Sequence, residues 1–291
     1  MRATMILVGM SPMFAYGQVI PTIQTTPANI MAKRPPTNQE PKEVVQMVPG
    51  IMVPDFGADR PGLSDPTDVL GVGMIQIETG FELGGSASGT LQERQSVLPQ
   101  VLLRVGVLPR LELRLNTDGY SSAISNENGT RTITKGFADS GVSAKIMVFE
   151  SDLVNFTIVP SLSIPSFDET FSSGTFDPGV ELVFGRGLPL GFDVGVNLNG
   201  ALPSGDAGRF FEASGGVAFG HDIAGNLGAY LELFGTLPVG EGDLDLVLNG
   251  GLTYVFENRY QIDIEYGESL TTDGDFFFGF GFAARIMKWY Y

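Results

Sequence analysis

Four charged residues fall at positions where a β-sheet would bring them together. They are Arg104, Glu112, Arg114 and Lys145, and each lies on the polar side of a segment in which polar and apolar residues alternate. Neighbouring strands are about 4.8 Å apart, so these side chains can meet across strands. Two interpretations stay open. One is a charge cluster that constricts or selects inside an enclosed space, and the other is a set of ion pairs that only neutralises inward-facing charge.

Carboxylates occupy the polar side of the later alternating segments. The acidic residues concerned are Asp139, Glu181, Asp193, Glu212, Glu232, Asp263 and Glu265. If the segments surround a space, these carboxylates form an acidic wall opposite the basic residues. Such a wall favours cations or neutral molecules over anions. We therefore predict a transverse field between a basic side and an acidic side.

Patterns typical of catalysis or metal binding are weak. His221, the only histidine, lies beside Asp222 in a predicted short turn, without a Gly-x-Ser-x-Gly motif or a second histidine at metal-binding spacing. The absence of cysteine excludes thiolate ligands and disulfides. Gly279 and Gly281 are followed by neither a phosphate-binding lysine nor a helix, so we expect them to pack on the outer side of a tight strand. We predict no catalytic residue, no metal and no cofactor, and hence no enzyme.

The elements that position these residues are predicted to be strands. From Leu111 to Asn116, for example, leucine alternates with polar residues, and a period of two is the signature of a strand with one apolar face. The pattern recurs often enough to predict twelve strands, an even number as bacterial single-chain barrels require. The predicted strands cover residues 74–83, 97–107, 111–116, 138–149, 155–165, 177–184, 190–199, 210–220, 226–234, 244–256, 259–267 and 276–287.

The connections alternate between short and long, which is typical of outer-membrane barrels. Short turns are predicted at 108–110, 150–154, 185–190, 221–225 and 257–258. Longer polar loops are predicted at 84–96, 117–137, 166–176, 200–209, 235–243 and 268–275. A soluble β-sandwich has no reason to alternate so regularly.

Composition and geometry together decide which face meets lipid. The chain of 291 residues carries a net charge of −16, and a run of 18 apolar residues that could cross a bilayer as a helix is absent from the sequence. Twelve strands enclose a space too wide for side chains to fill, so we expect the apolar face to look out to lipid and the polar face inward. The predicted fold is all-β, a transmembrane antiparallel up-and-down β-barrel of about twelve strands in the cell outer membrane. The acidity is typical of a solvated surface, with a cation-binding role as the alternative, and it argues against nucleic acid as a partner.

The two ends of the chain carry export and assembly signals. Residues 1–17 resemble a signal peptide. The proline-rich residues 18–65 are expected to form a disordered periplasmic arm, and residues 66–291 are expected to form the barrel. The arm is predicted to be a linker, with a tether or a plug as alternatives. Trp289 and Tyr291 at the C-terminus are similar to the aromatic signal that outer-membrane proteins present to the barrel assembly machinery, and an interfacial aromatic belt is the alternative.

A resemblance to a known family rests on particular stretches of the sequence. Asp59-Arg60-Pro61, the stretch 73–81 and the hairpin 102–115 resemble the opening of the outer-membrane transporters labelled "MetA-pathway of phenol degradation". Residues 136–145 and 160–165 are also similar, whereas the long proline-rich arm departs from the family pattern. The resemblance implies an outer-membrane location and a transport role.

Three classes of function follow from these observations, in order of preference. The first is a channel or transporter that passes small solutes, aromatic or hydrophobic ones among them. The second is a structural or adhesive barrel with a plugged lumen, and the third is an outer-membrane enzyme. The expected partners are outer-membrane lipid, the assembly machinery and an unidentified small solute.

Overall fold

The computed structural model describes residues 56–88, 91–167, 171–205 and 208–288. Nearly all of the regular structure is β. The strands are β1 (Met74–Ser88), β2 (Leu91–Leu108), β3 (Leu111–Thr117), β4 (Tyr120–Glu127), β5 (Thr130–Phe137), β6 (Ser140–Phe149), β7 (Asn155–Ile164), β8 (Asp177–Gly187), β9 (Phe192–Ala201), β10 (Ser204–Gly205), β11 (Gly208–Arg209), β12 (Phe211–Ala224), β13 (Leu227–Val239), β14 (Asp245–Phe256), β15 (Tyr260–Ser269) and β16 (Phe276–Lys288). One short 3-10 turn, η1 (Pro189–Gly191), precedes β9.

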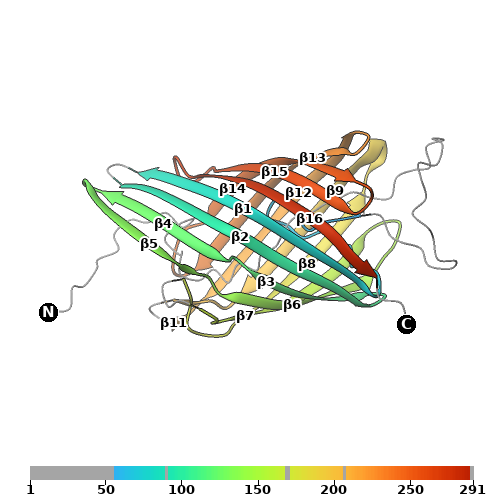
Figure 1. Cartoon of the computed structure of the whole chain (residues 1–291), viewed down its shortest axis with the longest axis horizontal. Helices are drawn as coiled ribbons and strands as arrows, with labels where there is room; N and C mark the ends of the chain where they lie inside the picture. The colour runs from blue at the N-terminus through green and yellow to red at the C-terminus, as the bar shows by residue number, and fades with distance from the viewer. Residues whose placement is uncertain (1–55, 89–90, 168–170, 206–207, 289–291) are drawn as a thin grey trace.

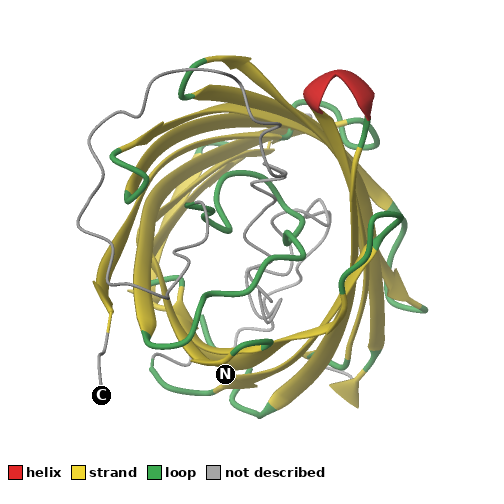
Figure 2. Ribbon diagram, turned by 90° about the vertical axis from the view of Figure 1, so that its right-hand side faces the viewer, coloured by secondary structure: helices red, strands yellow, loops and turns green. Residues whose placement is uncertain are grey.

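These strands form one closed antiparallel barrel (Figures 1 and 2). Each strand pairs with its neighbours, and the pairing of β1 with both β16 and β2 closes the wall. The sheet has 14 segments, but β2 pairs with β3 over one half and with β4 over the other, so β3 and β4 are one interrupted strand. β4 pairs with β5 and β3 pairs with β6, so β5 and β6 are also one interrupted strand. The fourteen segments therefore make the twelve strands that the sequence predicted.

Alternation along each strand sorts side chains between lipid and lumen, as expected from the sequence. On β3, Leu113 and Leu115 are each 49% exposed, whereas Glu112 and Arg114 are buried. On β15, Ile262 and Ile264 face outward, and Asp263 between them is buried in the barrel. A wall with apolar residues outside and polar residues inside is stable in lipid and would be unstable in water.

One rim of the barrel has the short turns that the sequence predicted. At the other rim, strands replace part of the predicted loops. Short turns join β2 to β3, β6 to β7, β12 to β13 and β14 to β15. At the other rim, residues 84–96 and 117–137, predicted to be loops, are mostly strand. The strand ends at 84–88 and 91–98, with β4 and β5, form a four-stranded extension, here called the wing. It projects beyond the other strands at the left of Figure 1.

The wing was missed because its outer face lies beyond lipid and need not be apolar. Its hairpin turn carries a recognisable signal nonetheless, since Asn128 and Gly129 have φ angles of 48° and 82°. Two consecutive left-handed residues of this type are what a tight two-residue hairpin requires. Within the described residues, the structure contains no helix that is long and apolar enough to cross a membrane.

The last part of the predicted proline-rich arm (18–65) is folded, contrary to expectation. Its last ten residues, 56–65, lie inside the barrel and are largely buried rather than extended and free. The predicted signal peptide, the rest of the arm (18–55), Trp289 and Tyr291 lie outside the described residues.

Candidate site in the barrel lumen

A segment before β1 enters the lumen. It comprises residues 56–73, here called the inner segment. It starts near the short-turn rim, where the backbone N–H of Phe56 donates to the side chain of Asn258 at 2.6 Å, and it ends where the Gly73 N–H donates to the Gly106 carbonyl at 2.8 Å. Figure 2 shows this chain as the green loop within the barrel. It therefore enters and leaves at the same rim.

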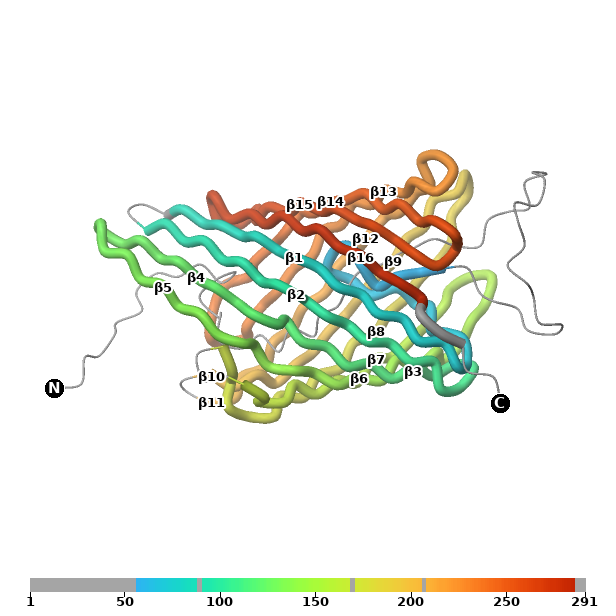
Figure 3. The backbone as a smooth tube through the Cα atoms, viewed as in Figure 1, coloured from blue at the N-terminus to red at the C-terminus, as the bar shows by residue number. Residues whose placement is uncertain are grey.

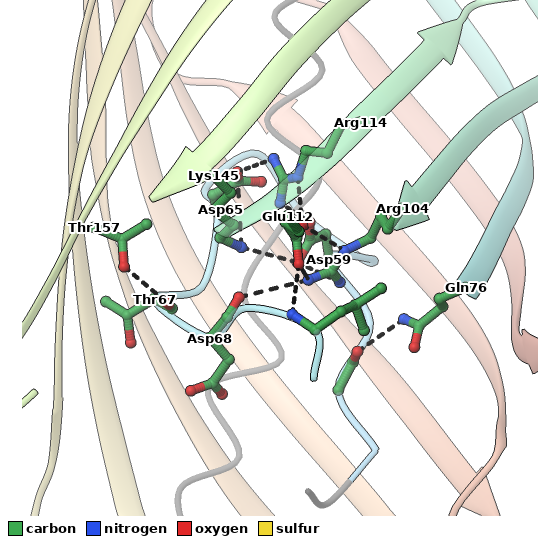
Figure 4. A network of polar contacts seen from close by, with 12 residues as sticks. Asp59, Asp65, Thr67, Asp68, Gln76, Arg104, Glu112, Arg114, Lys145 and Thr157 are labelled. Carbon is green, nitrogen blue, oxygen red and sulfur yellow. Dashed lines mark hydrogen bonds and ion pairs between the residues drawn. The ribbon is translucent and has the colours of Figure 1, made fainter. Parts of the chain in front are cut away.

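Arg104 of β2 connects the barrel wall to the inner segment. Its guanidinium donates to Glu112 of β3 at 2.9 and 2.8 Å and to Glu78 of β1 at 3.1 Å. It also forms an ion pair with Asp59 of the inner segment at 2.7 Å. All four groups are almost completely buried. Arg104 is thus neutralised by two carboxylates of the wall and one of the inner segment (Figure 4).

Arg114 and Lys145 complete the basic side of the lumen. Arg114 contacts both Asp59 and Asp65, and its Nε donates to Glu112 at 2.8 Å. The Lys145 ammonium, on β6, lies 3.1 Å from an Asp59 carboxylate oxygen and 3.9 Å from Asp65. Asp59 therefore pairs with all three cations of the cluster. The structure brings together the four residues that the sequence singled out, and adds three carboxylates that it did not, Glu78, Asp59 and Asp65.

The adjoining part of the wall, formed by β15, β16, β1 and β2, receives Arg60. The Arg60 Nε lies 3.5 Å from Asp263, and an outer nitrogen lies 3.7 Å from Glu265, both on β15. A second nitrogen donates to the Gln100 side chain at 3.1 Å. Asp59 and Arg60, which are adjacent in the chain, thus direct opposite charges to neighbouring parts of the wall, Asp59 toward β2, β3 and β6 and Arg60 toward β15.

Two glycines make room for the Arg60 guanidinium. Gly80 of β1 and Gly281 of β16 are paired across the sheet, and both face the lumen. A Cβ at Gly80 would lie 2.5 Å from Arg60 Cζ, and a Cβ at Gly281 would overlap the same side chain. The Gly80–Gly281 pair is therefore a seat for Arg60. Gly281 and Gly279 face the lumen, and the expectation that they pack on the outer side of the strand was wrong.

Side chains of the wall also hold the backbone of the inner segment. Four backbone N–H groups donate to carboxylates: Asp59 to Glu78 at 3.0 Å, and Gly62 to Glu265, Leu63 to Glu232 and Leu70 to Glu112, each at 2.7 Å. Five carbonyls accept from the wall: Gly57 from Gln76, Arg60 from Gln261, Asp65 from Asn197, Thr67 from Thr157 and Asp68 from Arg104, at 2.7–3.5 Å. A loop without secondary structure satisfies its buried polar groups in this way.

The remaining predicted residues divide into three groups. Glu181 is buried and hydrogen-bonded to Asn197 beside Asp65, so it belongs to the network. Asp193 and Glu212 face the lumen from β9 and β12 and are largely buried. Asp139 does not line the wall. Its carboxylate accepts from the Ser166 and Ser173 backbones at 3.0 and 3.2 Å and so orders the loop after β7.

The acidic and basic sides exist, but the space between them is not empty at this level. The inner segment lies there and carries charges complementary to each side. Sequence reasoning missed Asp59, Arg60 and Asp65 because the surrounding prolines indicated an unpaired arm. The sequence did contain an indication of their importance, since Asp59-Arg60-Pro61 was part of the family resemblance.

His221 lies on β12, three residues before the strand ends, rather than in a turn. Its ring stacks on Phe192 with centroids 4.2 Å apart, and its Nδ1 is 3.0 Å from the Gly191 carbonyl. These contacts place it at the short-turn rim beside η1, on different strands from those that form the charged network.

The fold, the apolar outer band and the polar lumen define an outer-membrane β-barrel. The chain belongs to the family described as "Putative MetA-pathway of phenol degradation", whose model matches residues 58–286. That match covers the whole barrel and begins inside the inner segment.

Solved structures with the same architecture are outer-membrane barrels. The COG4313 outer membrane channel from Pseudomonas putida F1 matches 76% of this chain and 98% of its own, with 12% identity and a TM-score of 0.54. The KdgM porin in complex with disordered oligogalacturonate matches 73% of this chain and 99% of its own, with 12% identity and a TM-score of 0.48. No curated protein matches the chain.

Proposed function

We propose that this protein is an outer-membrane channel for small solutes and that the inner segment is a fixed constriction of its lumen. The observation that carries the proposal is a closed barrel with a polar interior, crossed by one loop that the wall holds on opposite sides, at Arg104 of β2 and at Asn197 of β9 and Glu232 of β13. A wall of this kind gives polar solutes a route across the bilayer, whose hydrocarbon core they cross poorly.

The inner segment is too firmly held to act as a freely swinging lid. Asp59 pairs with three buried cations, and withdrawal of the inner segment would take from Lys145 both of its carboxylate partners, Asp59 and Asp65. Breaking a buried ion pair by removing one partner costs about 3–5 kcal/mol. We therefore place the segment in the conducting state of the channel.

The lumen favours small solutes with an apolar part. Apolar side chains face inward among the polar ones, and they include Val97, Leu102, Val247 and Phe277, each at most 6% exposed. Each of the four cations near the inner segment is paired with at least one carboxylate, so among these described residues no unpaired cation faces the path. Aromatic or hydrophobic molecules of modest size fit such a surface, and the family description points the same way.

A structural barrel with a plugged lumen is the second candidate. The observation that favours it is the number of sides from which the inner segment is held: β1, β2, β3, β6, β7, β9, β13 and β15 all contribute contacts. An enzymatic role is not proposed, because His221 stacks on Phe192 at the short-turn rim.

Single-channel recording in planar bilayers separates the two candidates. We expect the wild-type protein to show small, steady conductance steps. The variant Asp59→Ala/Arg60→Ala, which loses two of the three charged anchors and keeps Asp65, should show larger steps because its inner segment leaves the lumen. A wild type without any channel events, beside a variant that conducts, would assign the protein to the plugged class.

A further inference from the structure

The outer face of the wing carries three exposed cations. Arg94 lies on β2, and Arg131 and Lys135 lie on β5. They point to the same side as Leu98 and Phe137, which are exposed on the outside of the barrel. Side chains at positions separated by two or four residues share a strand face. The three cations therefore project away from the lumen.

Strand pairing places the three cations close together. Arg94 pairs with Ile124 of β4, which pairs with Ile133 of β5, and Arg131 and Lys135 flank Ile133 on the same face. With strands about 4.8 Å apart and a rise of about 3.4 Å per residue, the cations form a triangle with sides of about 12–14 Å. Long side chains can converge from these positions on a single large anion.

These cations have no counter-ion within the wing. None of the three forms an ion pair with a carboxylate of the described residues. Glu93, their acidic neighbour on β2, faces the interior and is 7% exposed. Arg209, which lies at the same rim, is by contrast paired with Asp177 at 3.0 Å. Unpaired cations on an outer face are unusual in a chain with a net charge of −16.

The position of the patch relative to lipid follows from the aromatic residues below it. Tyr120, Phe137 and Phe167 form an exposed aromatic cluster, with successive ring centroids 5.2 and 5.7 Å apart. Aromatic residues of this kind mark the membrane–water interface. Along β5, Lys135 lies about 7 Å and Arg131 about 20 Å beyond Phe137. The patch thus begins at the level of the headgroups and extends outward along β5. Figure 3 shows the course of the β4–β5 hairpin beyond the other strands.

We propose that the outer face of the wing binds the phosphorylated headgroup of lipopolysaccharide in the outer leaflet. Guanidinium groups bind phosphate through paired hydrogen bonds, and a cluster of cations beside an anionic lipid surface is strongly attracted to it. Cations on an edge strand can also serve to prevent edge-to-edge association. That role does not account for Arg94, because β2 is paired on both sides.

The test measures binding of purified full-length protein to vesicles that contain deep-rough lipopolysaccharide, which retains the lipid phosphates but few outer sugars. The variant Arg94→Gln/Arg131→Gln/Lys135→Gln should bind at least about tenfold more weakly than the wild type, and Arg94→Gln alone should lose about two- to threefold. Wild-type binding should weaken with added salt. Vesicles with dephosphorylated lipid should also lose the wild-type binding.

A matched control removes three exposed arginines from the opposite rim: Arg110→Gln/Arg186→Gln/Arg259→Gln. It changes the net charge by the same amount and should bind as the wild type does. Equal binding by the wing variant and the control, or undiminished binding to dephosphorylated lipid, would overturn the proposal. The folded-form band on unheated gels verifies that each variant forms a closed barrel.

Discussion

Asp59 has the largest share of the charged contacts in the lumen. It pairs with Arg104, Arg114 and Lys145, and its backbone N–H donates to Glu78 at 3.0 Å. Asp65 has fewer such contacts, since it pairs closely with Arg114 and more distantly with Lys145. The two carboxylates differ in their number of partners rather than in chemistry, which makes their comparison informative.

Replacement of Asp59 by Asn should loosen the inner segment without opening the barrel. Three buried cations lose a shared counter-ion, and we expect a cost of about 3 kcal/mol in docking of the segment. Limited chymotrypsin digestion should then cleave after Leu63, which the wild type protects. Asp65→Asn should have a smaller effect, and Asp152→Asn in an exposed turn should have none. Equal protection in all three variants would show that the ion pairs do not hold the segment.

The seat of Arg60 depends on two strands, β1 and β16, that close the barrel. Their glycines face each other and leave a gap that only a missing Cβ provides. Asp263 and Glu265 of β15 supply the charge beside that gap. Geometry and electrostatics of the seat therefore come from different elements.

Gly80→Val should expel the Arg60 side chain from its seat. The added carbons would occupy the position of the guanidinium, and overpacking of this kind costs about 1–3 kcal/mol. We expect larger conductance steps and a lower temperature for loss of the folded-form band on gels. Gly57→Ala is a control within the inner segment, because an added Cβ there meets no atom within 4 Å. Unchanged conductance in Gly80→Val would remove Arg60 from the constriction.

At the scale of strands and loops, the sequence predicts the barrel wall better than the inner segment that lies within it. All twelve barrel strands were recognisable, because lipid on one side and water on the other impose strict alternation, as in 111–116. The strands of the wing were not recognisable from the sequence, because Arg94 and Lys135 occupy outward positions that lipid would exclude. The position of the inner segment was not recognisable either. Distant residues such as Gln261 and Asn197 hold it in place by donating hydrogen bonds to its backbone carbonyls.

Considered as a whole, the molecule combines a rigid wall with one inserted loop. The wall is closed by a continuous ladder of strands, so large changes in its diameter would break many hydrogen bonds at once. The inner segment has no ladder and, apart from the backbone bond of Gly73 to Gly106 at its end, is held by side chains. Any large change in conductance must therefore come from the segment rather than from the wall.

A disulfide between the inner segment and the wall tests whether the segment stays in place during conduction. Thr67 and Gly185 of β8 suit this purpose, because a Cβ at Gly185 would lie 3.7 Å from the Thr67 Cβ, within the range that a disulfide spans. The chain contains no cysteine, so Thr67→Cys/Gly185→Cys introduces a single possible bond. If the segment is a fixed constriction, the oxidised variant should conduct as the wild type does, and reduction should change nothing. Conductance that disappears on oxidation and returns on reduction would show instead that the segment must leave its docked position before solutes pass.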